Sequence, residues 1–207
     1  LDCRDGSVTH VPFDLAAEDL ALLVIDTKAK HSLDDGQYGA RRAACERAAQ
    51  ILGVELLADI AIEDLPQALE RLSSTDDADE LIKRTRHVVT EIDRTRRLVD
   101  LLQDGRPLRG EKLAEAGRLM DASHESLRVD YECTCPELDV AVEAARAAGA
   151  HGARMTGGGF GGSAIALVNA DAVHDVAVAV AEAYAREGFN PPAFLNAVPA
   201  APAGRLV

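Results

Sequence analysis

The chain has 207 residues, of which 47% are hydrophobic and 28% charged, so it can bury a sizeable core in one large domain or two small ones. Its formal net charge of −13 at pH 7 argues against a nucleic-acid partner or an acidic membrane surface, because a phosphate polymer would be repelled. The sequence contains neither a run of about 18 apolar residues that would span a bilayer nor a signal-like apolar start, so we expect a cytoplasmic protein without a membrane partner.

Cysteine usage points to neither a disulfide framework nor a metal site. The four cysteines are too few and too scattered for a disulfide scaffold in a chain of this length. Cys133 and Cys135 lie close together, but they lack the second pair of ligands that a closed zinc site needs. We therefore expect no metal site in this chain. The cysteines are Cys3, Cys45, Cys133 and Cys135.

The N-terminal part reads as two strands followed by a helix. Residues 8–13 and 21–27 are short apolar runs rich in branched side chains, separated by an acidic turn, which predicts a pair of neighbouring strands. A polar, Gly-broken connection leads into a predicted helix over residues 38–52 that stops at Gly53. Connections between a strand and a helix often carry binding groups, because rigid elements hold them in place.

The middle of the chain is helical. We predict helices over residues 62–72, from a cap at residues 73–77 to Gly105, and over residues 107–127, where His124 has the spacing of a packing residue beside Leu127. The longest helix carries one apolar stripe, formed by Leu81, Thr85, Val88, Ile92, Thr95, Val99 and Leu102. Its other faces carry basic residues that read as a solvated face rather than a binding patch, namely Lys83, Arg84, Arg94, Arg96 and Arg97.

The C-terminal part alternates helices and strands. Thr134 is the predicted cap of a helix that starts at Pro136 and ends near residue 148, and a second helix follows Asp171 and ends at Gly188. Residues 163–168 and 193–198 are predicted strands. Together these elements predict an α+β fold with a mostly antiparallel sheet and helices packed on one face.

A glycine-rich stretch, Met-Thr-Gly-Gly-Gly-Phe-Gly-Gly at residues 155–162, is the strongest candidate for a site. Glycine reaches positive φ without a Cβ penalty, so such a run lets backbone N–H groups approach a ligand, and an anion suits them. The pattern matches neither the dinucleotide-binding fingerprint nor the P-loop. A tight hairpin is the alternative, and the glycines alone leave both open. They are Gly157, Gly158, Gly159, Gly161 and Gly162.

The polar connection before residue 38 holds further candidates. His31 beside Ser32 has the residue types of a nucleophile and its base, but no orienting carboxylate is identifiable, and a structural histidine is the simpler reading. Asp34 and Asp35 fit either a magnesium ion or a turn. Tyr38 is the better candidate because it lies at the junction of a strand and a helix, with a core tyrosine as the alternative.

Seven motifs, taken in order, resemble those of the galactokinases, members of the GHMP family of small-molecule kinases. The resemblance covers almost the whole chain, and its last two motifs together are far more specific than a glycine run alone. The motifs are Asp-Cys-Arg at residues 2–4, Lys-His-Ser-Leu at 30–33, Tyr38 with the pairs at 41–42 and 45–46, the Ser-His and Ser-Leu pairs within 123–127, Asp-Tyr-Glu at 130–132, Cys-Pro-Glu-Leu-Asp at 135–139, and the Arg-led glycine stretch at 154–162.

The resemblance implies that residues 1–207 form the C-terminal domain of a GHMP kinase, aligned only with the C-terminal half of a galactokinase. Galactokinases transfer the γ-phosphoryl group of ATP to the anomeric hydroxyl of α-D-galactose with the help of Mg²⁺. Their catalytic aspartate and arginine and their ATP-phosphate loop belong to the N-terminal half, so we expect no catalytic residue in this chain, Mg²⁺ and ATP bound mainly by the absent half, and no activity from this part alone.

Two roles carry over onto residues that are present. Tyr38 matches the tyrosine that binds the galactose ring, and the glycine stretch matches the motif that lies against the nucleotide-phosphate end of the cleft. We expect any Cβ in that turn, such as Val in place of Gly158, to damage turnover or folding. The implied partners are galactose, ATP and the missing N-terminal half. A sugar and nucleotide sensor without turnover, or a kinase for a related sugar, remain alternatives. Ser163 stands where relatives often have Cys, and we attach no functional change to it.

Overall fold

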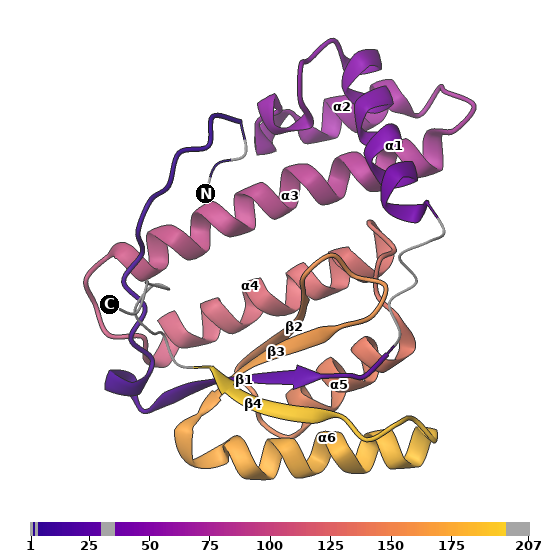
Figure 1. Cartoon of the computed structure of the whole chain (residues 1–207). Helices are drawn as coiled ribbons and strands as arrows, with labels where there is room; N and C mark the ends of the chain where they lie inside the picture. Colours follow the sequence, from indigo (N-terminus) through magenta and orange to yellow (C-terminus); the bar gives the residue numbers. More distant parts are fainter. Residues whose placement is uncertain (1, 3, 30–35, 198–207) are drawn as a thin grey trace, which may run out of the picture.

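The computed structural model describes residues 2, 4–29 and 36–197, and its centre is an antiparallel sheet (Figure 1). Four strands in the order β2-β3-β1-β4 form this sheet within the described residues. They are β1 (Leu20–Asp26), β2 (Gly152–Thr156), β3 (Ser163–Asn169) and β4 (Ala193–Ala197). Both neighbours of β1 come from the far end of the chain, with Val24 opposite Ile165 on β3 and Leu195 on β4. The predicted α+β class with an antiparallel sheet is confirmed.

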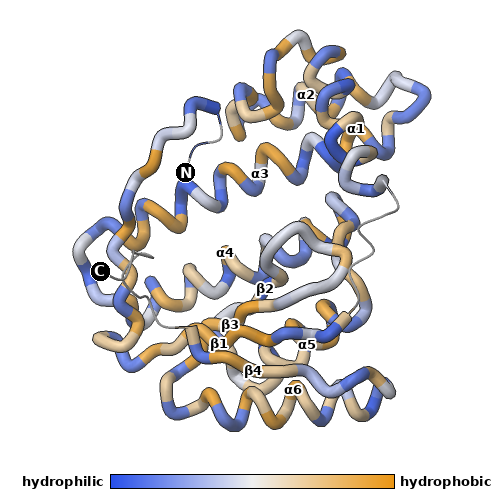
Figure 2. The backbone as a smooth tube through the Cα atoms, in the orientation of Figure 1, coloured by the Kyte–Doolittle hydropathy of each residue, from blue (hydrophilic) through white to orange (hydrophobic). Residues whose placement is uncertain are grey.

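One face of the sheet carries the main core. Alternate residues of β1 point to this face, and Leu23 and Ile25 are fully buried on it. The helices α5 (Pro136–Ala147) and α6 (Val173–Glu187) cover it, as Figure 1 shows, after the short 3-10 turn η4 (Ala170–Ala172). Figure 2 shows much of β1 and β3 as hydrophobic backbone. Helices cover this face as predicted, and the opposite face carries a helix that the prediction did not include.

A second, smaller cluster lies on the opposite face, where α4 (Gly110–Val129) runs along β2. The helix and the strand meet through glycines: a Cβ built on Gly117 would lie 1.7 Å from the carbonyl oxygen of His151. Leu20 and Leu167 from the sheet pack there with Ala116 of α4, near the 3-10 turn η1 (Ala16–Glu18). The backbones of α4 and β2 therefore approach more closely than any side chain would allow.

The remaining helices form a separate layer. A third hydrophobic cluster joins α1 (Gln37–Leu52), α2 (Leu65–Leu72) and the first turns of α3 (Ala78–Gln103), with the 3-10 turns η2 (Leu57–Asp59) and η3 (Ile62–Asp64) beside them. Figure 1 shows these helices on the far side of α4 from the sheet. The end of α1 follows the prediction, because Gly53 adopts the left-handed conformation that ends helices. No helix among the described residues is long and apolar enough to cross a membrane.

Two local predictions are wrong. Residues 8–13 are not a strand: Val8 is 63% and Phe13 43% exposed, and both edges of β1 are already occupied by β3 and β4. A strand has only two edges, so no place remains for this segment beside β1. The residue that caps α5 is Cys135, in an extended conformation, rather than Thr134, although Pro136 does open the helix as predicted.

The predicted faces of α3 are also wrong in part. Leu81 and Thr85 are buried as expected, but Thr95 is exposed and the second half of the stripe is only partly covered. Arg84 is 3% exposed, and the side chain of Arg94 keeps 14% of its surface, so these two are not on a solvated face. The reason is that the centre of α3 packs on α4 through ion pairs and hydrogen bonds instead of apolar side chains.

Candidate functional site

The glycine stretch forms the turn of the β2–β3 hairpin, so the hairpin alternative describes its backbone correctly. Phe160, in the middle of the turn, is left-handed with φ 59°. The glycines on either side share this conformation, with φ values of 88° at Gly157, 84° at Gly159, 135° at Gly161 and 90° at Gly162. A hairpin of this shape leaves open whether it also binds a ligand.

Gly159 and Gly158 have opposite surroundings. A Cβ built on Gly159 would lie 2.4 Å from the carbonyl oxygen of Cys133, and the same carbonyl accepts a hydrogen bond of 2.6 Å from the N–H of Phe160. Gly158 is exposed, lies outside the left-handed region and has no atom within 4 Å of a built Cβ. A Cβ would therefore collide with the fold at Gly159 but not at Gly158, and the expected effect of a side chain at Gly158 on turnover stays a prediction.

The end of β1 holds the other side of the turn. Thr27 is buried, and both its N–H and its Oγ1 donate to the carbonyl oxygen of Gly162, over 3.0 and 2.6 Å. The Thr27 hydroxyl also accepts from the N–H of Ala29 at 3.2 Å. Lys28 is left-handed with φ 56° and pairs with Asp26. The glycine turn is thus anchored at both of its ends by neighbouring segments.

The first turns of α1 lie beside the glycine turn. Tyr38 is 67% exposed, so the core-tyrosine alternative is wrong. One turn later, Arg41 donates from Nε to the carbonyl of Tyr131 at 3.1 Å and from Nη2 to that of Glu132 at 2.9 Å. Its guanidinium carbon also lies 5.6 Å from the centre of the Phe160 ring. The helix turn that carries Tyr38 and the glycine turn are therefore linked through Arg41.

Backbone strain gathers around this site. Among the described residues, four that are not glycine have a left-handed φ, and three of them, Lys28, Glu132 and Phe160, flank the glycine turn. The fourth, Asp19, ends η1. A left-handed residue with a side chain costs on the order of 1–3 kcal/mol, and such residues cluster at functional sites. The strain supports a functional reading of this corner of the molecule.

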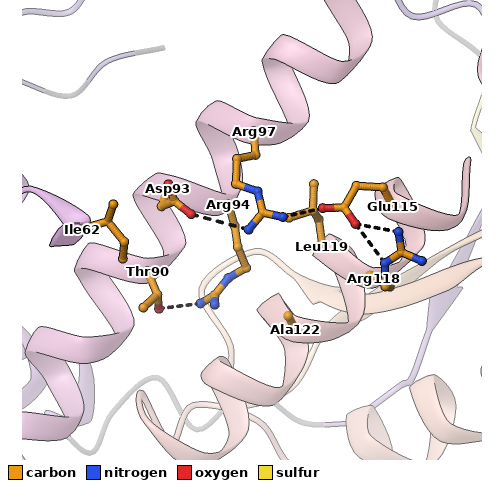
Figure 3. Close-up of a pocket in the computed structure, with 9 residues that line it drawn as sticks. All are labelled: Ile62, Thr90, Asp93, Arg94, Arg97, Glu115, Arg118, Leu119 and Ala122. Atoms are coloured by element: carbon orange, nitrogen blue, oxygen red, sulfur yellow. Dashed lines mark hydrogen bonds and ion pairs between the residues drawn. The ribbon is translucent and has the colours of Figure 1, made fainter. Parts of the chain in front are cut away.

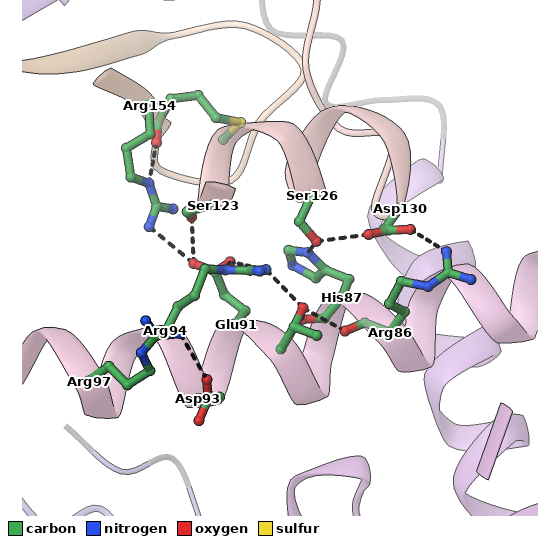
Figure 4. A network of polar contacts seen from close by, with 12 residues as sticks. Arg86, His87, Glu91, Asp93, Arg94, Arg97, Ser123, Ser126, Asp130 and Arg154 are labelled. Atoms are coloured by element: carbon green, nitrogen blue, oxygen red, sulfur yellow. Dashed lines mark hydrogen bonds and ion pairs between the residues drawn. The ribbon is translucent and has the colours of Figure 1, made fainter. Parts of the chain in front are cut away.

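A polar network between α3 and α4 supports the connection between α4 and α5 (Figure 4). Asp130 accepts from Ser126 Oγ at 3.1 Å and from Arg86 Nη1 at 2.8 Å, and His87 Nδ1 lies 3.0 Å from the same Ser126 hydroxyl. The ring of His87 stacks on Tyr131 at 4.4 Å between centroids. Burial lowers the pKa of His87 to about 4, so this histidine is neutral at neutral pH.

Arg84 joins this network to Glu132. Its guanidinium donates to the carbonyl of Asp130 and, over 2.8 Å, to the carboxylate of Glu132. The hydrogen bond from Arg84 holds the pKa of the Glu132 carboxyl below its usual range. A buried arginine of this kind is hidden in the sequence, because a charged residue inside an amphipathic pattern reads as solvated.

Glu91 of α3 is a second residue that the sequence did not single out. It accepts from the Ser123 hydroxyl and lies 3.3 Å from Arg154 and 2.9 Å from Arg94 (Figure 4). Arg154 opens the glycine motif and also donates to the carbonyl of Met155 at 2.9 Å. Glu91 therefore ties α3 and α4 to the strand that leads into the glycine turn.

His124 of α4 binds the backbone of β2 in addition to packing in its helix. Its Nδ1 accepts from the N–H of Met155 at 3.2 Å, and its Nε2 lies 3.2 Å from Asp139 Oδ1 on α5. The residue is buried, so the helical spacing beside Leu127 correctly placed it inside the protein. Its hydrogen bond to Met155 fastens α4 to β2 just before the glycine turn, and Asp139 of α5 lies beside its other ring nitrogen.

A hollow of about 420 Å³ lies elsewhere, between η3, α3 and α4 (Figure 3). Three arginines line it, and each is paired with a carboxylate. A second hollow of about 370 Å³ lies beside residues 13–16 and β1. Neither is lined by Tyr38 or by the glycine turn. The arginines of the first hollow are Arg94, Arg97 and Arg118, paired with Glu91, Glu115 and Glu111.

Other polar residues from the sequence contribute less. His31, Ser32, Asp34 and Asp35, together with Cys3, lie outside the described residues. Within the described part, no three His, Cys, Asp or Glu side chains gather so that they could hold a metal ion. Burial raises the pKa of the Cys133 thiol to about 11, which keeps it protonated and unreactive.

Comparison with known proteins identifies the fold. Residues 106–186 match the family model for the C-terminal domain of GHMP kinases. This part of the chain resembles the C-terminal domain of GHMP kinases. This confirms the family that the motifs resemble, and the matched region holds α4, α5, the glycine turn and β3.

The similarity to galactokinases covers the whole chain. This chain is 50% identical over 207 residues to the galactokinase of Streptomyces coelicolor, and the match covers 100% of this chain and 51% of that protein. It is 42% identical over 185 residues to the galactokinase of Bos taurus. The crystal structure of Lactococcus lactis galactokinase complexed with galactose superposes with a TM-score of 0.83 at 34% identity, over 95% of this chain and 49% of that one. The chain spans about half the length of the curated relatives it matches.

Proposed function

We propose that this chain is the C-terminal half of an ATP-dependent galactokinase, with residues 1–207 forming a single domain. The complete protein would transfer the γ-phosphoryl group of ATP to the anomeric hydroxyl of α-D-galactose. The observation that carries the proposal is 50% identity to a galactokinase over all 207 residues. The superposition on a galactokinase that binds galactose supports the same substrate.

The described residues fit two parts of such a cleft. The exposed hydroxyl of Tyr38 is available to a sugar hydroxyl at the start of α1. Gly157 and Gly158 are exposed and have no neighbouring atom within 4 Å of a built Cβ, so a phosphate group has room to approach their backbone. Bound ATP supplies the phosphoryl group. Phosphoryl transfer is mostly positioning and charge stabilisation, and this half would contribute the positioning.

The groups that stabilise charge belong to the other half in this proposal. The resemblance to galactokinases assigns Mg²⁺ and the catalytic side chains mainly to the N-terminal half, and this chain spans about half the length of those relatives. We place the reaction in the cytoplasm, where ATP is available. Three free thiols, Cys45, Cys133 and Cys135, agree with a reducing compartment.

The test is Tyr38→Phe in the complete protein. Loss of one neutral hydrogen bond, worth roughly 0.5–1.5 kcal/mol, should raise the galactose KM up to about tenfold. The ATP KM should stay unchanged, because the hydroxyl is assigned to the sugar. Arg42→Lys is the matched control: Arg42 lies on the same helix, is exposed and pairs only with Glu46 in the described contacts.

Each alternative has its own outcome in a coupled assay of ADP release with a panel of sugars. An unchanged galactose KM would remove Tyr38 from the site. Binding of galactose and ATP without ADP release would show a sensor, and a higher kcat/KM for another sugar would show a kinase of different specificity. Either result would replace the proposed reaction.

A further inference from the structure

Tyr38 and the glycine turn belong to different parts of the fold. Tyr38 stands on α1, whose apolar residues pack with α2 and α3. The glycine turn connects β2 and β3 of the sheet, and its Phe160 packs against the core that α5 and α6 cover. A cleft that holds a sugar at one element and a nucleotide at the other needs a fixed distance between the two, and separate hydrophobic clusters do not supply it.

Arg41 bridges these two parts. Its two hydrogen bonds end on consecutive carbonyls, those of Tyr131 and Glu132, and its flat guanidinium faces the ring of Phe160. The following residue, Cys133, accepts the N–H of Phe160 at 2.6 Å. Arg41 therefore binds the α4–α5 connection by hydrogen bonds. It contacts the glycine turn through the Phe160 ring, and the α4–α5 connection binds that turn as well.

The chemistry of this contact is specific to arginine. A planar guanidinium presents several N–H groups in a fixed fork and stacks on aromatic rings, whereas a lysine ammonium is a point charge on a flexible stem. Glu132 adopts a left-handed φ of 52° in the segment that Arg41 binds. Arg84, buried on α3, also binds this segment, through the carbonyl of Asp130 and the carboxylate of Glu132. Two arginines therefore hold the segment, of which only Arg41 belongs to the helix of Tyr38.

We propose that Arg41 is a positioning residue that sets the distance between the galactose-binding turn of α1 and the nucleotide-side glycine turn. This inference rests on the proposed galactokinase function for its catalytic consequence. Its structural part stands independently of that function. Arg41 itself touches neither the sugar nor the nucleotide in this proposal.

The experiment compares Arg41→Lys with Arg42→Lys in the complete protein. Both changes keep the charge on neighbouring residues of one helix, and Arg42 makes only an exposed ion pair with Glu46, at 2.8 Å. We expect Arg41→Lys to lower kcat about tenfold or more, to raise the galactose KM by less than Tyr38→Phe does, and to change the ATP KM by less than about threefold, because misaligned reactants are bound but react slowly. Arg42→Lys should behave as the unchanged protein.

Two further measurements separate positioning from simple support of the fold. Tyr38→Phe should raise the galactose KM less in the Arg41→Lys background than alone, because a displaced Tyr38 has less of a contact to lose. Amide hydrogen exchange at Phe160 should become faster in Arg41→Lys and stay unchanged in Arg42→Lys. A lower melting temperature with unchanged kcat, or exchange at Phe160 equal in both variants, would overturn the proposal.

Failure of the proposed function is a distinct result. If the unchanged protein releases no ADP with galactose, the reaction is wrong, and kinetics are repeated with the sugar that the panel selects. If no sugar is turned over, the exchange at Phe160 still decides whether Arg41 joins the two turns. Faster exchange in Arg41→Lys alone would support the structural link, and equal exchange in both variants would refute it.

Discussion

Replacing Gly159 by Ala is the sharpest test of how the glycine turn is built. The added Cβ would lie 2.4 Å from the carbonyl oxygen and 2.9 Å from the Cβ of Cys133, where ordinary contacts lie beyond 3.4 Å. The turn and the α4–α5 connection would have to separate by about 1 Å, which is enough to break the hydrogen bond from Phe160 N–H to Cys133.

The expected cost follows from two effects. A left-handed alanine costs about 1–2 kcal/mol, and Gly159 has φ 84°. The lost hydrogen bond adds about 0.5–1.5 kcal/mol. We therefore expect Gly159→Ala to lower the free energy of unfolding by about 1.5–3.5 kcal/mol and the melting temperature by about 3 °C or more.

The matched control is Gly158→Ala, one residue earlier. Gly158 lies outside the left-handed region and has no atom within 4 Å of a built Cβ, so we expect a stabilising change of about 1 kcal/mol or less, because alanine restricts the unfolded chain. Differential scanning fluorimetry of both variants beside the unchanged protein is the assay. Equal melting temperatures for Gly158→Ala and Gly159→Ala would refute the close contact with Cys133.

Two further predictions concern stability. Gly117→Ala should lower the free energy of unfolding by about 3 kcal/mol or more, because its Cβ would lie 1.7 Å from the carbonyl oxygen of His151. Its control is Gly39→Ala, at an exposed and open position of α1, which should raise the free energy of unfolding by about 0.5–1 kcal/mol. Thermal unfolding that ranks the two variants otherwise would contradict the close packing of α4 on β2. Burial lowers the pKa of His87 from 6.5 to about 4, so protonation of this histidine favours the unfolded chain. The stability that neutral His87 gives the folded protein is fully present above pH 6.5 and is lost as the pH falls toward 4. Urea unfolding should show about 2 kcal/mol of this loss between pH 7 and 4.5, and His87→Gln, which keeps a partner for Ser126, should show a smaller pH dependence than the unchanged protein.

Much of the local structure was predictable from local signals. The helix that ends at Gly53 and the helix that opens at Pro136 follow from caps that act within one turn. The hairpin at the glycine stretch follows from the apolar strand after it and from residues that reach positive φ. The motifs also led to the correct family, because their order and spacing survive in a chain that spans half of its relatives.

Long-range pairing was not predictable in the same way. The segment at residues 8–13 has the composition of a strand, but β1 bonds to β3 and β4, which lie more than 130 residues later in the chain. Composition describes how well a segment suits a sheet, whereas pairing depends on which edges the rest of the fold has already filled.

The sequence by itself determined the fold class, most helix ends, the family and the two elements of the candidate site, because caps, periodicity and motif spacing are properties of neighbouring residues. Only the tertiary structure decided that Gly159 and not Gly158 packs against Cys133, that Arg84 is buried and Glu91 joins α3 to Arg154, and that Arg41 links the helix of Tyr38 to the glycine turn. These facts depend on atoms about 30 to 120 residues apart along the chain, and a contact of that kind exists only once the chain has folded.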